Sequence, residues 1–210
     1  MTAHDALGRC TVVPLKAARY ADEAWFREAW PDVLNAAGEG ALRLVHDHAA
    51  VLLKPDAFAG RTALAAVRLL AGAGFAPVAA RRVEVGRHAA RALWLYRFNV
   101  ATADRIVLHD QIFAAGPSML VVLRSAGDAG GVPATVRLTA LKGSSRPERR
   151  SPEQLRSRLG VGNRLLNVLH TSDEPADLVR ELAIFLDGAE RRALLRELAT
   201  VAGVREAEDA

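Results

Sequence analysis

The hydrophobic and polar positions of the chain follow a regular pattern from residue 49 onward, and this pattern predicts strands that alternate with helices. Short, nearly all-apolar runs are typical of buried strands, whereas apolar positions three or four residues apart are typical of helices with one buried face. The predicted strands are 49–54, 76–85, 119–123 and 167–169. The predicted helices are 62–73, 86–97, 103–114, 132–141, 173–186 and 189–201.

The order of these elements is that of a ferredoxin-like split βαβ arrangement. We therefore expect an α+β fold with a four-stranded antiparallel sheet and helices on one face. Between the predicted elements, residues 142–166 contain glycine, serine, proline and many charges without a clear hydrophobic period. A loop of this length in a compact domain is either functional or disordered.

Residues 1–48 precede this pattern and are expected to form a partly helical extension. Aromatic residues and alternating charges between Lys16 and Trp30 predict a helix that stops near Pro31. Such an aromatic stripe is more typical of packing on a core or a second subunit than of a nucleic-acid surface. The predicted organisation is an extension, a central domain and a C-terminal helix with a tail, at 1–48, 49–187 and 188–210.

Composition and charge narrow the class of protein without identifying it. The chain has 210 residues, half of them hydrophobic, and a formal net charge of +4 carried mostly by arginine. No apolar run is long enough to span a membrane and the N-terminus has no signal-peptide pattern, so a cytoplasmic protein is expected. Cys10 is the single cysteine, and His46 and His48 have no third partner, so neither a disulfide nor a metal site is predicted.

The stretch 167–186 contains the strongest candidate for chemistry, His170. This histidine lies between a short apolar run and a helix start at which Thr171 and Glu174 have capping-box spacing. Such a junction suits a nucleophile or proton carrier, but it is also an ordinary place for a surface histidine. The loop 142–166 leaves a similar choice open, since its six arginines suit either an anion or solvent. They are Arg146, Arg149, Arg150, Arg156, Arg158 and Arg164.

Three separated stretches together resemble the nucleoside diphosphate kinase family. They are Lys-Pro-Asp at 54–56, the loop from Gly143 to Arg156, and Asn-Val-Leu-His-Thr-Ser-Asp at 167–173 followed by Glu181. The family pattern has Lys-Pro-Asp, a Gly-x-Thr-Asn-Pro loop with an arginine thirteen residues after the glycine, and Asn-x-x-His-Gly-Ser-Asp with a glutamate eleven residues after the histidine. Arg156 and Glu181 have these spacings, and the resemblance covers roughly residues 49–187.

The resemblance implies a role for each matching residue. His170 would be the phosphohistidine nucleophile, Glu181 would orient it, and Lys54 would contact the transferring phosphate and the sugar. Magnesium would arrive with the nucleotide, and homo-oligomers are common in the family. The residues implied in nucleotide binding are Lys54, Arg156 for the outer phosphates, Asn167 for the ribose, Ser145, Ser172, Trp94 and, out of register, Arg137.

The chain departs from the family pattern at several positions. Thr171 stands where the family has glycine, and Thr139 stands where it has a phosphate-binding arginine four residues before the loop glycine. The phenylalanine that stacks on the nucleobase has no clear counterpart, with Ile106 and Phe98 as the nearest candidates. The resemblance therefore implies retained phosphate chemistry and an altered base site.

These patterns predict a nucleoside diphosphate kinase-like phosphotransferase that passes a γ-phosphoryl group through His170 to a nucleoside diphosphate, with a specialised acceptor as one option. The alternative is a catalytically impaired protein that keeps the fold as a nucleotide-binding or assembly subunit. Thr171 and the lost stacking residue would then be signs of decay. The expected partners are nucleoside tri- and diphosphates and other copies of the chain, rather than a membrane or nucleic acid.

Overall fold

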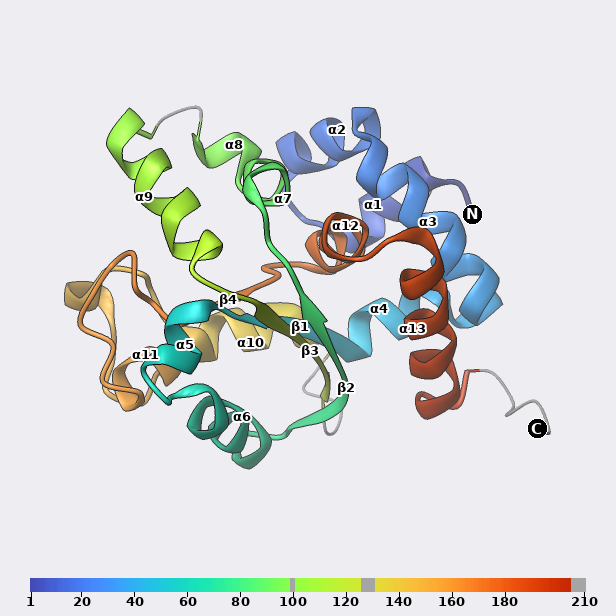
Figure 1. The fold of residues 1–210 in the computed structure, drawn as a ribbon. Helices are drawn as coiled ribbons and strands as arrows, with labels where there is room; N and C mark the ends of the chain where they lie inside the picture. Colours follow the sequence, from blue (N-terminus) through green and yellow to red (C-terminus); the bar gives the residue numbers. More distant parts are fainter. Residues whose placement is uncertain (99–100, 126–130, 205–210) are drawn as a thin grey trace.

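A single antiparallel sheet forms the centre of the molecule in the computed structural model, which describes residues 1–98, 101–125 and 131–204. Its strands are β1 (His48–Leu53), β2 (Phe75–Val83), β3 (Ser118–Ser125) and β4 (Leu169–Thr171). The strand order is β2-β3-β1-β4, and each neighbouring pair is antiparallel (Figure 1). The predicted α+β class and four-stranded antiparallel sheet are confirmed.

The edge strand β4 begins two residues later than the sequence predicted. Val168 has a φ of 60°, a left-handed conformation that does not continue a strand. The chain is held there because the Val168 amide donates to Asp56 Oδ2 at 2.9 Å and its carbonyl accepts from the Lys54 amide at 2.9 Å. Consequently His170 lies inside β4, paired with Leu52 of β1, and not after the strand.

Helices cover both faces of the sheet, whereas the sequence predicted one face. All six residues of β1 are buried, and successive side chains of a strand point to opposite faces. Val51 and Leu53 therefore pack in one hydrophobic cluster, and Ala50 and Leu52 in another. The first cluster includes residues of α5 (Pro55–Ala59), α6 (Ala63–Gly72), α10 (Ala134–Lys142) and α11 (Leu155–Arg158). The second includes residues of α3 (Ala24–Ala37), α4 (Ala41–Asp47), α12 (Pro175–Phe185) and α13 (Gly188–Val201).

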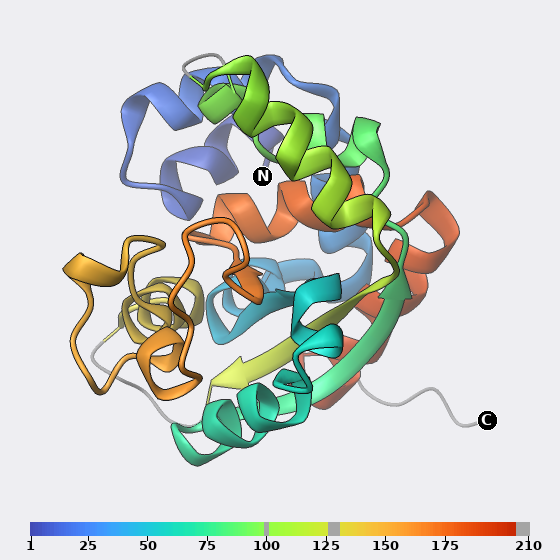
Figure 2. The same ribbon diagram turned by 60° about the vertical axis from the view of Figure 1, so that its left-hand side comes forward.

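The N-terminal extension is more helical than predicted and belongs to the same core. Two helices, α1 (Ala3–Cys10) and α2 (Pro14–Asp22), precede α3, and a short 3₁₀ turn, η1 (Gly38–Gly40), leads into α4. The expected single helix is divided at Glu23, and Pro31 lies inside α3 without ending it. Proline in a helix interior is unfavourable, but Phe26, Trp30 and Val33 bury one face of α3 and hold it in place. Figure 2 shows α12 between α1 and α2, drawn in dark blue, and the sheet.

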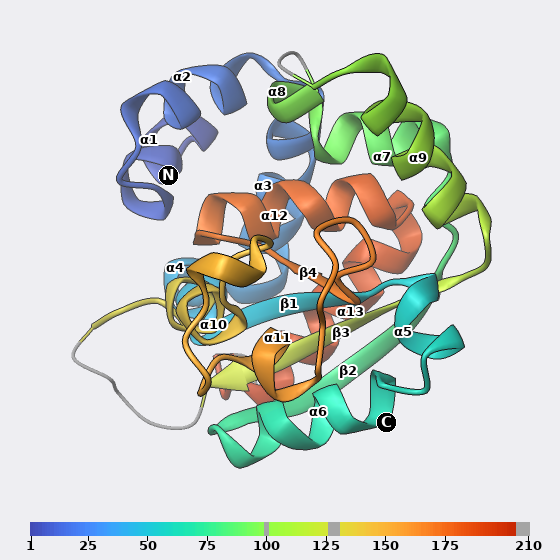
Figure 3. The same ribbon diagram turned by 90° about the vertical axis from the view of Figure 1, so that its left-hand side faces the viewer.

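The remaining elements form the surroundings of β4. Between β2 and β3 the chain forms α7 (Arg87–Leu93), α8 (Leu95–Phe98) and α9 (Ala103–Ala114). The segment 143–168, expected to be a loop as far as residue 166, contains the short helix α11 and a 3₁₀ turn, η2 (Pro147–Arg149). Figure 3 shows α7 to α9 above β4 and this segment beside it. In the described part of the chain, no helix is long and apolar enough to cross a membrane.

Candidate active site

A cleft of about 1020 Å³ opens beside β4 and contains most of the residues singled out from the sequence. Its walls come from α2, from the α7–α9 region, from the segment 143–168 and from β4 with α12. Seven of the nine sequence-predicted site residues line it: Lys54, Trp94, Ser145, Arg156, Asn167, His170 and Glu181. Ser172 is buried immediately behind Glu181. Arg137 is not brought to this cleft.

The imidazole of His170 is held by the carboxylate of Glu181. Nε2 of His170 lies 2.9 Å from Glu181 Oε1, and because a carboxylate accepts, the ring donates its Nε2 proton. Ser172 Oγ donates to the other carboxylate oxygen at 2.7 Å, so both oxygens of Glu181 are fixed. Trp94 meets the ring edge-on, with centroids 5.5 Å apart. Nδ1 of His170 makes no hydrogen bond to the described residues and is left for an incoming group.

Helix α12 positions Glu181, and its start differs from the prediction. Thr171 still belongs to β4, so the helix is capped by Glu174, whose side chain forms a capping box with Asp177. Leu178 and Leu182 anchor the same helix in the core. The antiparallel return from β4 into α12 therefore brings Glu181, eleven residues along the chain, over His170.

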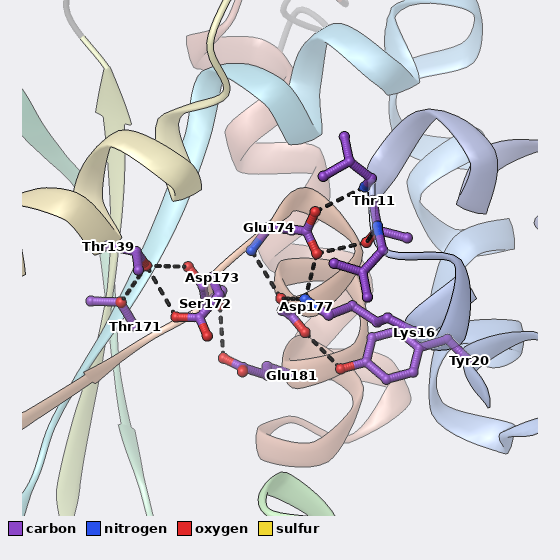
Figure 4. A network of polar contacts seen from close by, with 12 residues as sticks. Thr11, Lys16, Tyr20, Thr139, Thr171, Ser172, Asp173, Glu174, Asp177 and Glu181 are labelled. Carbon is purple, nitrogen blue, oxygen red and sulfur yellow. Dashed lines mark hydrogen bonds and ion pairs between the residues drawn. The ribbon is translucent and has the colours of Figure 1, made fainter. Parts of the chain in front are cut away.

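The N-terminal extension clamps the first turn of α12 (Figure 4). Thr11 Oγ1 donates to Glu174 at 2.6 Å, and Lys16 Nζ contacts Glu174 at 2.5 Å and Asp177 at 2.7 Å. Tyr20 donates its hydroxyl to Asp177 at 2.6 Å. Lys16 and Tyr20 also line the cleft. Residues 1–48 thus contribute to the site, which the sequence did not indicate.

Lys54 lines the cleft, and its side chain is almost fully buried. It follows β1, and its Nζ donates to the Leu165 carbonyl at 2.8 Å and lies 3.6 Å from Asp56 Oδ1. Burial lowers the pKa of Lys54 to about 8, and the positive charge of Arg156 adds to this effect while Asp56 opposes it. A bound anion would favour the charged amine again.

Arg156 joins the segment 143–168 to β4. Its guanidinium donates to the carbonyls of Gly143 at 2.8 Å, Leu169 at 2.7 Å and Asn167 at 3.3 Å. Burial lowers the pKa of Arg156 to about 10. Three of its five N–H groups are used in this way, which leaves two for a ligand in the cleft.

Asn167 and Ser145 lie on the outer part of the cleft. The Asn167 amide donates to the Arg164 carbonyl at 2.8 Å, and the Ser145 carbonyl accepts from Arg150 at 2.8 Å. Both side chains border the cleft, with the Ser145 residue exposed.

Arg137 lies over the Phe75 ring, 5.5 Å from its centroid, and lines a separate pocket together with Arg9 and Arg124. Because Arg137 and Thr139 are two residues apart on α10, they face different sides of that helix. The structure therefore separates this arginine from the other predicted residues.

An aromatic wall stands beside His170. Trp94 packs against His109 and Phe113, with centroids 4.3 and 5.3 Å apart. Burial lowers the pKa of His109 to about 4, and the charge of Lys54 contributes, so this ring is neutral at physiological pH. Neither His109 nor Phe113 was singled out from the sequence, because only the fold brings α9 next to Trp94.

Helix α9 contributes residues to the cleft, but the sequence-based candidate Ile106 is not among them. Arg105 and His109 of α9 line the cleft, whereas Ile106 does not. The side chain of Phe98, the other candidate, lies outside the described residues.

Magnesium brought by a nucleotide is compatible with this cleft, and a dedicated protein cage is not evident. Among the described residues, no three histidines, cysteines or carboxylates are grouped to hold a metal. The carboxylates that line the cleft are already bound to protein donors: Asp173 to Lys142, Asp177 to Lys16 and Tyr20, and Glu181 to His170 and Ser172. His46 and His48 instead contact the carbonyls of Arg9 and Leu44.

Comparison with known proteins gives a family and a fold. The sequence pattern described as nucleoside diphosphate kinase matches residues 47–191. Similar solved structures include nucleoside diphosphate kinases from Aquifex aeolicus (20% identity, TM-score 0.54), Encephalitozoon cuniculi (16%, 0.56) and Borrelia burgdorferi (20%, 0.55), the last a transition state mimic with vanadate and ADP. They cover 69%, 69% and 68% of this chain and 97%, 91% and 88% of their own. No curated protein matches the chain.

Proposed function

This chain belongs to the nucleoside diphosphate kinase family, and we propose that it transfers the γ-phosphoryl group of a nucleoside triphosphate to a nucleoside diphosphate through a phosphohistidine at His170. The observation that carries the proposal is the hydrogen-bonded pair of His170 and Glu181, which uses Nε2 and leaves Nδ1 without a hydrogen bond to the described residues, in a cleft that the buried cations Lys54 and Arg156 also line.

In the first half-reaction, the lone pair of His170 Nδ1 attacks the γ-phosphorus. The N–P bond forms while the bond from the γ-phosphorus to the bridging oxygen breaks, and the nucleoside diphosphate leaves with that electron pair. The ring gains positive charge in this step. Glu181 stabilises that charge through the Nε2 proton, 2.9 Å from its carboxylate. In the second half-reaction, a terminal oxygen of the acceptor diphosphate attacks the same phosphorus and the N–P bond breaks.

The cations of the cleft supply the charge neutralisation that phosphoryl transfer requires. Lys54 would contact the transferred group, and Arg156 would offer its two remaining N–H groups to the outer phosphates. Magnesium, when bound with the nucleotide, neutralises phosphate charge. The Asn167 amide borders the cleft where it could reach a ribose hydroxyl.

A specialised acceptor is part of the proposal. In this cleft Arg105 and Arg164 border the outer part, from α9 and from the segment 143–168. Arginine packs on planar groups and pairs with anions, which differs from an apolar slot for a nucleobase. A turnover screen across natural diphosphates would identify the preferred acceptor.

The direct test is incubation with γ-labelled ATP and magnesium. We expect the protein to acquire an acid-labile, alkali-stable phosphate, and His170→Ala to acquire none. His88→Gln, which changes an exposed histidine on α7, is the matched control and should label as the wild type does. A wild-type protein that takes up no label would favour the non-catalytic alternative, a subunit that only binds nucleotide.

A further inference from the structure

A cluster of polar residues joins the end of α10 to β4. Lys142 Nζ donates to Thr171 Oγ1 at 2.7 Å and to Asp173 Oδ1 at 3.2 Å. Thr139, one helical turn earlier, lies 3.0 Å from the Thr171 hydroxyl and 3.2 Å from Asp173 Oδ1. Figure 4 shows Thr139, Thr171 and Asp173 gathered at one end of the row of contacts that continues to Glu181 and α12.

The side chain of Lys142 is buried, although the residue lines the cleft. Lys142 is one of only three lysines in the chain, it is 9% exposed, and it lines the same cleft as His170 and Arg156. Its bonds to Thr171 and Asp173 leave one of its three N–H groups without a partner among the described residues. A buried cation with a spare donor at the wall of a cleft is suited to an anion.

The electrostatic surroundings also favour an anion at this point. Burial lowers the pKa of Lys142, and the charge of Arg156 lowers it further, while Asp173 and Glu181 oppose these effects. Arg156 has the same effect on Lys54. The positive charge of Arg156 therefore disfavours the charged form of each lysine, and a phosphate group beside Arg156 and Lys142 would relieve that repulsion.

The cleft is lined from both faces of β4, which brings Lys142 and His170 to the same cavity. Neighbouring residues of a strand point to opposite faces, so Thr171 and Lys142 lie on the face opposite His170. However, β4 is an edge strand, paired only with β1. The cleft extends around its free edge, because it is lined by His170 and Glu181 from one face and by Leu169 and Lys142 from the other.

Two departures from the family pattern coincide in this cluster. The hydroxyls of Thr139, where the family has arginine, and of Thr171, where it has glycine, touch each other, and Thr171 also holds Lys142. We propose that Lys142 binds the β- or γ-phosphate of the nucleotide beside Arg156, and that Thr171 positions it there. This proposal rests on the proposed function for the identity of the ligand. In this proposal Thr171 has a positioning role in phosphate binding and does not indicate a loss of function.

The test compares Lys142→Met with Lys142→Arg by calorimetric titration with ADP and with AMP in the presence of magnesium. For Lys142→Met we expect ADP affinity to fall about tenfold to a hundredfold, as for the loss of one charged hydrogen bond. AMP affinity should stay within about twofold, because AMP lacks the outer phosphates, and Lys142→Arg should recover most of the ADP affinity since it keeps the charge.

The matched control is Arg137→Met, which removes a cation from the same helix on the side away from the cleft. It should leave ADP affinity unchanged. Thr171→Val, which keeps the branched shape and removes the hydroxyl, should weaken ADP binding several-fold. If Lys142→Met binds ADP as the wild type does, or loses AMP and ADP affinity equally, the proposal is overturned.

The role of Lys142 in phosphate binding can be refuted independently of the proposed kinase activity. A wild-type protein that forms phosphohistidine while Lys142→Met keeps its ADP affinity would refute the role of Lys142 alone. A protein that forms no phosphohistidine but loses ADP affinity in Lys142→Met would refute the kinase activity and retain this phosphate contact.

Discussion

Each carboxylate oxygen of Glu181 accepts one hydrogen bond, from His170 and from Ser172. Glu181→Ala removes the group that orients the imidazole and stabilises its charge, and it leaves the hydrogen bonds of Lys54 and Arg156 in place. We expect the rate of His170 phosphorylation by ATP to fall about tenfold to a hundredfold, the effect of one charged hydrogen bond. Rapid-quench labelling measures the rate, and ADP titration should show affinity within about twofold of the wild type. Equal labelling rates in the wild type and Glu181→Ala would show that Glu181 does not assist phosphorylation of His170.

Lys54 gives the site a pH dependence with a defined sign. Its pKa of about 8 lies below the ordinary value of 10.5, because of burial first and Arg156 second. The amine therefore loses its charge as pH rises through 8, and ATP affinity should decline above that pH. Keeping the amine charged costs folding stability below pH 8, and this cost disappears between pH 8 and the ordinary pKa.

The variant Lys54→Arg tests this dependence, because guanidinium stays charged over the range. Calorimetric ATP titrations from pH 6.5 to 9.5 should show a decline for the wild type and a smaller one for the variant. The remaining slope would come from Lys142, whose pKa burial also lowers. The same slope in both proteins would contradict the assignment.

Sequence spacing was informative for residues that the fold places together through a short connection. The pairing of His170 with Glu181 was implied by the family resemblance, whose eleven-residue spacing the chain matches, and the two residues belong to a strand and the helix that follows it. Lys142 could be noticed only as one of three lysines, because its contacts with Thr171 and Asp173 depend on the docking of α10 against β4. No sequence pattern indicated that Lys16 and Tyr20 line the cleft and hold the first turn of α12.

At the scale of elements, α12 is the helix on which the site depends, and its first turn is held by the extension. Burial alone would lower the pKa of Lys16, but Asp177 and Glu174 outweigh it and raise the pKa, so this amine stays charged. Lys16→Met leaves both carboxylates without their cation. We expect the free energy of unfolding to fall by about 2 to 4 kcal/mol, as when one partner of a largely buried ion pair is lost.

Urea denaturation measures this change, with Arg43→Met as the control. The pair of Arg43 and Asp47 has the same charges on an exposed helix face and should contribute well under about 1 kcal/mol. A Lys16→Met protein as stable as the wild type would show that the clamp does not hold α12.

Element types were predictable from periodicity, and element ends were not. The four strands were expected close to their observed positions, most clearly β1 and β3, whose residues are mostly apolar and buried. The start of β4 was misplaced because the left-handed residue is Val168, a type that gives no such signal. Pro31 did not end α3 because tertiary packing of Phe26 and Trp30 outweighs the local preference of proline.

For the whole molecule, the first 48 residues are part of the fold. Phe26, Trp30 and Leu44 are at most 1% exposed and pack in the same cluster as Leu52 of the sheet. We therefore propose that residues 1–48 and 49–187 unfold as one unit, although the family match begins at residue 47. A chain that lacks residues 1–47 should lose its cooperative thermal transition in circular dichroism. A cooperative transition in the shortened chain would instead show that the extension is a separate addition.

The proposed mechanism requires that the phosphoryl group be attached to one atom of the protein, a ring nitrogen of His170. ³¹P NMR of the protein after reaction with ATP and magnesium identifies that atom, because phosphate on the two imidazole nitrogens gives different signals. With Nε2 held by Glu181, we predict phosphate on Nδ1 of His170, and its loss with formation of ATP when ADP is added. Phosphate on Nε2, on another residue, or on no residue would contradict the mechanism.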